Sequence, residues 1–287
     1  MISVCVGDNV IDYYVNNGRM YPGGNSLNVS VHLARLGNDS VYLGNIADDR
    51  MAGVIQRALD ANNVDHSHCE IIEGGTTKHC NYNVVDGERS FVNVVTGDKW
   101  SGPMDLTEDK IEYLKGFDVI ISNCNAKMQD EMKKISRLDK IYVYDFGEKE
   151  KYHVDEYLDL VCTNLDLAMF SFPHVDEETI REFAEKIMAH GAVNVLVTMG
   201  SHGQYLINSN GIVHGEVKYV EAVDTMGAGD SFLAAFVDEM MRLGWEKGEV
   251  LPQEKIVRAF DKASSYSRDN CLQGGGFGYE ILDQETA

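Results

Sequence analysis

A Gly-Ala-Gly-Asp turn that opens a helical pattern is the segment of the sequence with the clearest chemical use. It lies within VDTMGAGDSFLAAFVDEMMRLG, residues 223–244, where an apolar stripe follows at helical spacing. Because Gly227, Ala228 and Gly229 carry little side-chain bulk, their backbone amides can approach an anion closely. The helix dipole also favours negative charge at this end. The turn therefore predicts a phosphate site built without a basic residue.

Asp230 follows this turn directly and is the most informative single residue. A carboxylate at an anion-binding helix start would repel phosphate unless its task is to take a proton there, as a general base for a hydroxyl group. The alternative is an ordinary helix cap, a position where aspartate is common. Both interpretations remain open from local sequence alone.

A second glycine-rich junction, YPGGNSLNVSVHLARLG at residues 21–37, places amide side chains at the start of another helical pattern. Gly23 and Gly24 precede Asn25 and Asn28, whose amides can both donate to and accept from sugar hydroxyls. The alternative is that Asn25 or its neighbour only caps the helix.

Other candidate residues are more isolated in the sequence. Asp12, just beyond the first apolar run, can accept two hydroxyls of a polyol, with a solvated loop acid as the alternative. His66, His68 and Cys69 suggest a structural metal, but no second cluster at ligand spacing accompanies them. The Asp-Phe-Gly at 145–147 lacks the other protein-kinase motifs, so we interpret it as a strand end. No Gly-Lys dipeptide is present, which excludes the usual P-loop.

Alternating strand and helix patterns must position these residues. Helices are predicted over residues 107–115 and 176–190, the first with Thr107 as its cap. Strands are predicted at ISVCVG (2–7), SVYLGNIA (40–47), DVIISNC (118–124), KIYVYDF (140–146), DLVCTN (159–164) and NVLVTMG (194–200). This alternation predicts an α/β fold, a mostly parallel sheet with helices on both faces.

One region departs from that alternation. KHCNYNVVDGERSFVNVV, residues 78–95, predicts an antiparallel hairpin with a turn at Asp86 and Gly87. Residues 13–21 are expected to join it in a small β lid over a site, and residues 204–217 predict a second hairpin that turns at 208–211. Without an internal repeat or linker, residues 1–287 are expected to form one domain.

Composition narrows the partners and the location. The 25 Lys and Arg against 46 Asp and Glu give a formal charge of -21, which disfavours nucleic acid and membranes as partners. The same charge repels ATP, so a nucleotide site would need amide donors, local basic groups and a divalent metal. The start of the chain lacks a basic segment, the six cysteines show no Cys-x-x-Cys spacing, and no run is long enough to span a membrane, so we expect a cytoplasmic protein with reduced thiols.

Together, the two glycine-rich junctions resemble the paired signatures of the pfkB (ribokinase-like) family of carbohydrate and nucleoside kinases. GGNSLNVSVHLARLG matches the amino-terminal signature, DTMGAGDSF the carboxy-terminal one, and VTMGSHGQ at 197–204 resembles the nucleotide-side strand and turn. The resemblance implies a ribokinase-like fold and an ATP- and Mg²⁺-dependent sugar kinase, with Asp230 as the base and the amides of Gly227, Ala228 and Gly229 on the transferred phosphate.

Further site residues follow from the resemblance only. The residues expected to face the sugar are Asp12, Gly23, Gly24, Asn25 and Asn28, and those expected near the nucleotide are Thr198, Gly200, Gly203 and Thr225. A monovalent cation held by the backbone around Asp224 and Thr225 is a further candidate ligand, and family lids often pair into homodimers.

The metal ligands are unknown from the sequence, because a family motif is incomplete. Asn-x-x-Glu usually follows a central strand and serves magnesium and phosphate. In TNLDLAMFSFP, residues 163–173, Asn164 is present but Leu167 stands in place of the glutamate, and Glu148 follows a different strand end.

The acceptor is suggested by several segments. GDNVIDYY, GGTT at 74–77, GERSFV at 87–92 and the glutamate-lacking LDLAMFSFP resemble fructoselysine 6-kinases, a group within the family that acts on sugar-amine adducts. Fructoselysine or another fructosamine, phosphorylated at its 6-hydroxyl, is therefore the expected substrate. Ribokinase, fructokinase and nucleoside kinase activities are the alternatives, and a catalytically silent sugar-binding regulator is a further one. A dinucleotide-dependent dehydrogenase would need a glycine-rich fingerprint after the first strand, which is absent.

Overall fold

The computed structural model describes residues 1–85, 88–97, 99–100 and 102–282, and an eight-stranded sheet runs through them. Six neighbouring strands are parallel, and two antiparallel strands extend one edge. In spatial order the strands are β14 (Gly211–Gly215), β13 (Gln204–Asn208), β12 (Ala192–Thr198), β11 (Leu165–Ser171), β10 (Ile141–Asp145), β9 (Val119–Asn123), β1 (Ile2–Val6) and β4 (Asp39–Leu43). The α/β class and the second hairpin predicted from the sequence are confirmed.

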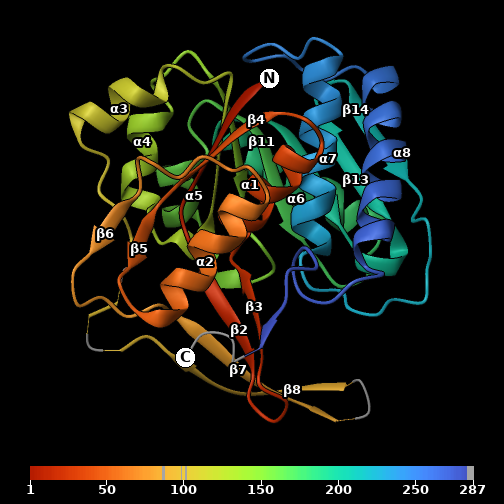
Figure 1. The fold of residues 1–287 in the computed structure, drawn as a ribbon. Helices are drawn as coiled ribbons and strands as arrows, with labels where there is room; N and C mark the ends of the chain where they lie inside the picture. Colours follow the sequence, from red (N-terminus) through yellow and green to blue (C-terminus); the bar gives the residue numbers. More distant parts are fainter. Residues whose placement is uncertain (86–87, 98, 101, 283–287) are drawn as a thin grey trace.

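Helices cover both faces of this sheet (Figure 1). One face packs against α1 (Asn25–Arg35), α7 (Ala228–Arg242) and α8 (Gln253–Asn270), and the other against α3 (Glu108–Leu114), α4 (Met132–Ile135), α5 (Asp155–Val161) and α6 (Glu177–Ala189). The strands serve both cores through their period of two: in β10, Tyr142 and Tyr144 face one core, while Ile141 and Val143 face the other.

Local capping chemistry sets two of the predicted helix starts. The Thr107 side chain accepts a hydrogen bond from the Lys110 amide at the start of α3, and Asp176 accepts one from Thr179 at the start of α6. The strand predicted at 159–164 is wrong. The first half of this segment forms the end of α5, because Leu158, Val161 and Cys162 recur at helical spacing and are fully buried. The next strand, β11, begins only at Leu165.

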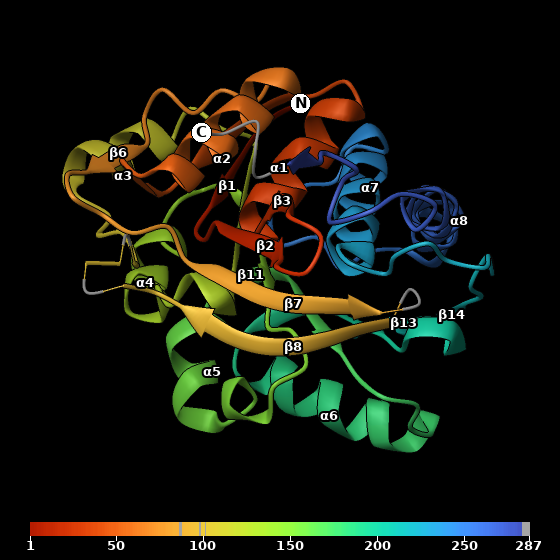
Figure 2. The ribbon, with the colours of Figure 1, turned by 60° about the horizontal axis from the view of Figure 1, so that its bottom comes forward.

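A five-stranded small sheet contains both segments predicted for the lid. Its order is β15 (Ile281–Leu282), β3 (Arg19–Gly23), β2 (Val10–Tyr14), β7 (His79–Val85) and β8 (Glu88–Val95); β2 and β7 are parallel and the other pairs antiparallel. Figure 1 shows it beneath the main body, and Figure 2 shows β7 and β8 running side by side across that face. The predicted turn at Asp86 and Gly87 lies outside the described residues.

The remaining elements complete the frame. Helix α2 (Arg50–Ala61) packs with α1 over the small sheet, next to a two-stranded sheet of β5 (Asn45–Ala47) and β6 (Glu70–Ile72). Strand β8 is an edge strand whose Phe91, Val92 and Val94 are exposed, a surface that pairing would bury. The homodimer through the small sheet stays a prediction. In the part of the chain that the structure describes, no helix is long and apolar enough to cross a membrane.

Candidate active site

A cavity of about 610 Å³ lies where the carboxyl ends of central strands meet the amino ends of α1 and α7. Asp145 and Ser171, the last residues of β10 and β11, lie in its wall, and Lys78, Cys80 and Tyr82 of the small-sheet side complete it. This edge is where α/β proteins bind ligands, because loops and helix starts gather there. The small sheet is therefore placed as a lid would be.

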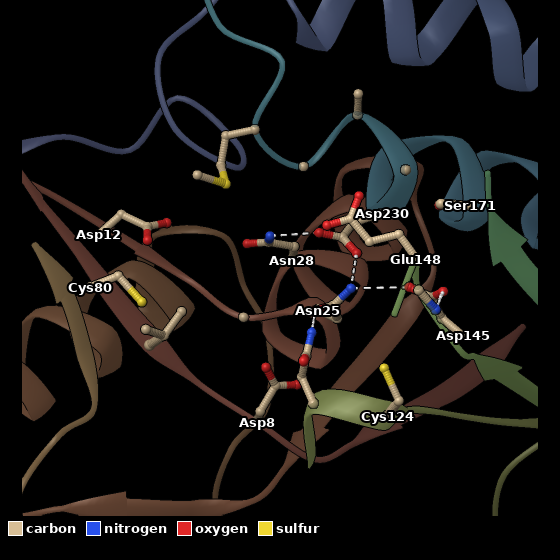
Figure 3. A pocket seen from close by; sticks show the side chains of 18 of the residues that line it. Asp8, Asp12, Asn25, Asn28, Cys80, Cys124, Asp145, Glu148, Ser171 and Asp230 are labelled. Carbon is tan, nitrogen blue, oxygen red and sulfur yellow. Dashed lines mark hydrogen bonds between the residues drawn. The ribbon is translucent and has the colours of Figure 1, made fainter. Parts of the chain in front are cut away.

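Asp230 is held in this cavity by two asparagines of α1 (Figure 3). Asn25 Nδ2 donates to Asp230 Oδ1 at 3.0 Å, and Asn28 Nδ2 donates to Asp230 Oδ2 at 2.8 Å. The helix cap is Gly227, which has no side-chain cap bond, so the cap interpretation of Asp230 is wrong. The same holds for Asn25 and its neighbour, because Gly24 precedes α1 in the cap position.

Asn25 also links Asp230 to a second buried acid. Its Nδ2 donates to Asp145 Oδ2 at 3.0 Å, and its Oδ1 accepts from Asn125 Nδ2 at 2.8 Å. The buried Asn28 Oδ1, in contrast, has no hydrogen-bond partner among the described residues. An unsatisfied buried acceptor is costly, so this oxygen is suited to a hydroxyl of a bound ligand.

The protonation of these two acids is set mainly by burial. Burial raises the pKa of Asp230 to about 7; the Asn28 and Asn25 amides oppose the rise, and the charges of Asp145 and Asp8 add to it. Burial likewise raises the pKa of Asp145 to about 6, against the hydrogen bonds from the Gly147 amide and Asn25. A carboxylate with a pKa near 7 is suited to accept a proton at neutral pH.

In the turn before Asp230, Gly227 and Gly229 are surrounded differently. Gly227 has a φ of 69°, and a Cβ there would lie 2.6 Å from the Gly276 carbonyl oxygen, so backbone conformation and a close contact require glycine. At Gly229 the nearest atom to a Cβ would be Met169 Cε at 3.6 Å, an ordinary contact. Gly229 is therefore free of steric demands from the fold, and its missing side chain leaves space in the cavity.

A second cavity of about 570 Å³ adjoins the first. The residues predicted for the nucleotide side, Thr198, Gly200, Gly203 and Thr225, all line it. The residues common to both cavities are Glu148, Ser171, Thr225, Ala228 and Gly229. Two cavities that share the wall at the start of α7 provide what group transfer needs, a donor space and an acceptor space that meet at an anion site.

The structure also gathers the residues predicted to face the sugar. Asp12 lies on β2, is only 6% exposed and lines the first cavity, so it is not a solvated loop acid. Gly24 lines the cavity and, with a φ of 106°, would bring a Cβ within 2.8 Å of the Asp8 carbonyl oxygen. Gly23 lies between side chains, since its Cβ would lie 3.6 Å from Asp12 Oδ2 and 3.5 Å from Asn28 Oδ1.

Several residues of the site were missed by sequence reasoning. Asp8 lies in the cavity wall, and its Oδ1 accepts a hydrogen bond from Asn123 Nδ2 at 2.8 Å. Asp145 was taken only for a strand end, and Lys149 and Asn125 were not noticed. All of them follow or end strands β1, β9 and β10, so the signal available was their common place at the carboxyl ends of parallel strands.

The assignment of Asn164 and Leu167 to the family motif is corrected by the structure. Asn164 precedes β11, at the end of the strand away from Ser171, and donates to the Ser136 carbonyl at 3.0 Å. Leu167 is fully buried within the sheet. At the site β11 ends with Ser171 and is followed by Phe172, Pro173 and His174, which supply neither the asparagine nor the glutamate.

Comparison with known proteins relates the sequence of the chain to carbohydrate kinases. A model of the pfkB family of carbohydrate kinases matches residues 4–267. The fructosamine kinase FrlD of Bacillus subtilis (strain 168) is 28% identical over 277 residues, which cover 96% of this chain and 93% of that protein. The fructoselysine 6-kinase of Escherichia coli (strain K12) is 30% identical over 251 residues, 86% of this chain and 90% of that protein.

Solved structures show the same fold at lower sequence identity. Ribokinase from Giardia lamblia superposes with a TM-score of 0.80 and 16% identity, covering 99% of this chain and 97% of that one. Fructokinase with bound ATP from Xylella fastidiosa gives a TM-score of 0.79 and 16% identity, covering 99% and 96%. The fold is therefore ribokinase-like, as the sequence predicted.

Proposed function

The chain belongs to the pfkB family of carbohydrate kinases, and on that premise we propose that it transfers the γ-phosphate of ATP to the 6-hydroxyl of a fructosamine, with Asp230 as general base. That it is an ATP-dependent sugar kinase follows from the family. One observation supports the role of Asp230 most directly: its carboxylate is held by two asparagine amides at the start of α7, beside the wall common to both cavities. Intact positioning of this kind speaks against a catalytically silent regulator.

In the proposed reaction, Asp230 accepts the proton of the acceptor hydroxyl while the oxygen of that hydroxyl forms a bond to the γ-phosphorus of ATP. The bond from that phosphorus to the bridging oxygen breaks, and ADP leaves. The amides of Gly227 and Gly229 and the start of α7 stabilise the negative charge on the transferred phosphoryl group, while the Ala228 amide donates to the Thr225 carbonyl at 3.2 Å and holds the turn. Asn25 and Asn28 orient the carboxylate, while Asn28 Oδ1 and Asp12 accept hydroxyls of the sugar, with the small sheet as lid.

Magnesium fits the donor set at the wall between the cavities. Mg²⁺ in kinases is held by one or two carboxylates together with phosphate oxygens and water, and it neutralises charge on the phosphates. Glu148, exposed and common to both cavities, is the residue we propose to hold it, with Asp145 behind. A monovalent cation near Asp224 and Thr225 stays a prediction that rests on the resemblance.

The charge of the first cavity, which we call the acceptor cavity, supports a sugar-amine as substrate. Five carboxylates line it, those of Asp8, Asp12, Asp145, Glu148 and Asp230, against the two lysines Lys78 and Lys149. A cationic amine enters such a field more favourably than a neutral sugar. The two relatives described above are named as fructosamine and fructoselysine kinases, which is the second reason for the proposal.

We expect fructoselysine to exceed ribose, fructose and adenosine by at least about tenfold in kcat/KM, or about 1.4 kcal/mol in transition-state binding. ADP release with each acceptor at fixed ATP measures it. If ribose, fructose or adenosine wins by that margin, the sugar kinase stands and the fructosamine assignment fails.

A side chain at Gly229 should separate activity from stability. Gly229→Val is expected to lower kcat/KM by about a hundredfold, because the branched side chain fills the wall common to both cavities. The unfolding temperature should stay close to that of the parent protein, since glycine is the poorest helix former after proline. Gly53→Val in α2, with only Arg57 nearby, is the matched control and should keep full activity. Equal losses of stability and activity at Gly229 would indicate a purely structural turn.

A further inference from the structure

Four lysines gather at the outer edge of the acceptor cavity, in a protein whose formal charge is -21. Lys78 precedes β7 of the small sheet, and Lys149 follows β10; both line the cavity. Lys127 lies two residues beyond Asn125 of the cavity wall, and its ammonium lies over Trp100, which bridges to Thr76 next to the start of β7. Lys151 lies two residues beyond Lys149. We call Lys78, Lys127, Lys149 and Lys151 the lysine cluster.

The ammonium groups of the lysine cluster have no anionic partner among the described residues. Within that part of the chain, none of these groups takes part in a hydrogen bond or an ion pair. Lys127 Nζ lies 4.6 Å from the centre of the Trp100 ring, and Lys151 Nζ lies 4.7 Å from that of Tyr152. Lys127 also has a φ of 55°, a conformation uncommon for a residue other than glycine. Like charges brought together without an acidic partner are unfavourable unless an anion joins them.

Burial lowers the pKa of Lys127, and the charges of the other three lysines lower it further. An anion bound among them would relieve that repulsion. The cluster therefore has the electrostatics of an anion subsite whose ligand comes from solution.

The placement of the cluster favours the acceptor over the nucleotide. None of the four lysines lines the second cavity, whose basic residues are Lys218 and Arg268. Lys127, Lys149 and Lys151 are exposed, whereas Asp230 is only 8% exposed. An acceptor with its reacting hydroxyl at Asp230 would thus extend outward past Cys80 and Tyr82 toward the lysines.

We propose that the lysine cluster binds a carboxylate at the far end of the acceptor, so that the substrate is a sugar joined through an amine to an amino acid with a free carboxyl group. This proposal rests on the proposed function and adds to it which part of the acceptor is recognised. The carboxylates of the inner cavity are complementary to the amine that joins the two parts, and the lysines at the edge are complementary to the terminal carboxylate.

The test compares fructoselysine with its carboxamide, which lacks only the negative charge. In the unmodified enzyme, kcat/KM for the carboxylate should exceed that for the carboxamide by about tenfold or more, because several lysines act together on one charge. In the double variant Lys127→Gln and Lys149→Gln, the ratio should fall toward one. The control is Lys133→Gln, an exposed lysine of α4 outside both cavities, which should leave the ratio as it was.

The other possible results of this experiment would each contradict the proposal in a different way. Equal kcat/KM for the two acceptors in the unmodified enzyme would overturn the carboxylate subsite while leaving the fructosamine kinase intact. A rise in the KM for ATP without a change in the ratio would assign the lysines to the nucleotide and overturn it too. A ratio that falls equally in Lys133→Gln would show that net charge alone is responsible. If neither compound is phosphorylated but another sugar is, the proposed acceptor class itself fails.

Discussion

Replacing Asp230 with asparagine is expected to lower kcat by about a hundredfold to ten-thousandfold, the usual contribution of a positioned general base. Asparagine has nearly the same shape and can still accept a hydrogen bond from Asn25 or Asn28, so ATP binding and the fold should be kept. Steady-state ADP release, with ATP binding measured separately, checks it. A turnover close to that of the parent enzyme would contradict the role of Asp230.

The pH dependence sharpens this test. Because Asp230 has a folded-state pKa of about 7 against an ordinary 3.8, the folded protein holds the proton more tightly than the unfolded chain between these values. Its contribution to stability is therefore full below about pH 4 and is lost as the pH rises through about 7. The base must be ionised to work, so activity should fall below about pH 7. Asp230→Asn should lack the stability loss at high pH, because the amide does not ionise.

A second acid on the same helix provides the matched control. Asp238 is 1% exposed and accepts hydrogen bonds from Asn38 and Arg242. It also forms an ion pair with Lys262. Burial opposes ionisation of Asp238, but these donors outweigh it and lower its pKa. Asp238→Asn should therefore lose stability at neutral pH and keep its turnover. Asp230→Asn is thus expected to lose activity and keep its stability, and Asp238→Asn to lose stability and keep its activity.

Sequence reasoning predicted the parts of this site that are local in the chain. Both glycine junctions, the helices that follow them and the hairpin at 78–95 depend on neighbouring residues, whose periodicity and turn chemistry are visible in a single sequence. The contact of Asn25 with Asp145 and Asp230 depends on strand order instead. Which strand ends become neighbours is decided by the packing of the whole sheet, so Asp145 looked like a strand end and nothing more.

The error at Asn164 has a related physical cause. The apolar residues Leu160 to Cys162 resemble a short buried strand, although they belong to the end of α5, and the sequence does not reveal that β11 starts only at Leu165. Placing the strand too early moved the motif to the wrong end of β11. Leu167 is then explained as a core residue, and Ser171 is the residue that reaches the site.

Removing divalent metal should abolish activity, with a loss of about a thousandfold or more and full recovery when Mg²⁺ is added in excess over the chelator. The charges of the site give the reason. The acceptor cavity is lined by five carboxylates, and the basic residues of the second cavity are already paired, Lys218 with Asp261 and Arg268 with Asp269. Amides alone do not offset the charge of ATP in such surroundings. Unchanged ADP release in chelator would refute the requirement.

The need for Mg²⁺ can be tested at one residue, Glu148. If its carboxylate holds the ion, Glu148→Gln should raise the Mg²⁺ concentration for half-maximal velocity by about tenfold, because one of the few carboxylates that Mg²⁺ uses is lost. The Mg²⁺-dependent binding of ATP, measured by calorimetry without an acceptor, should weaken in parallel. Glu150→Gln is the control, since Glu150 is also an exposed acid, two residues away, and lines neither cavity. If the two variants need the same Mg²⁺ concentration, the ion is held by the phosphates and other groups, and Glu148 has no part in binding it.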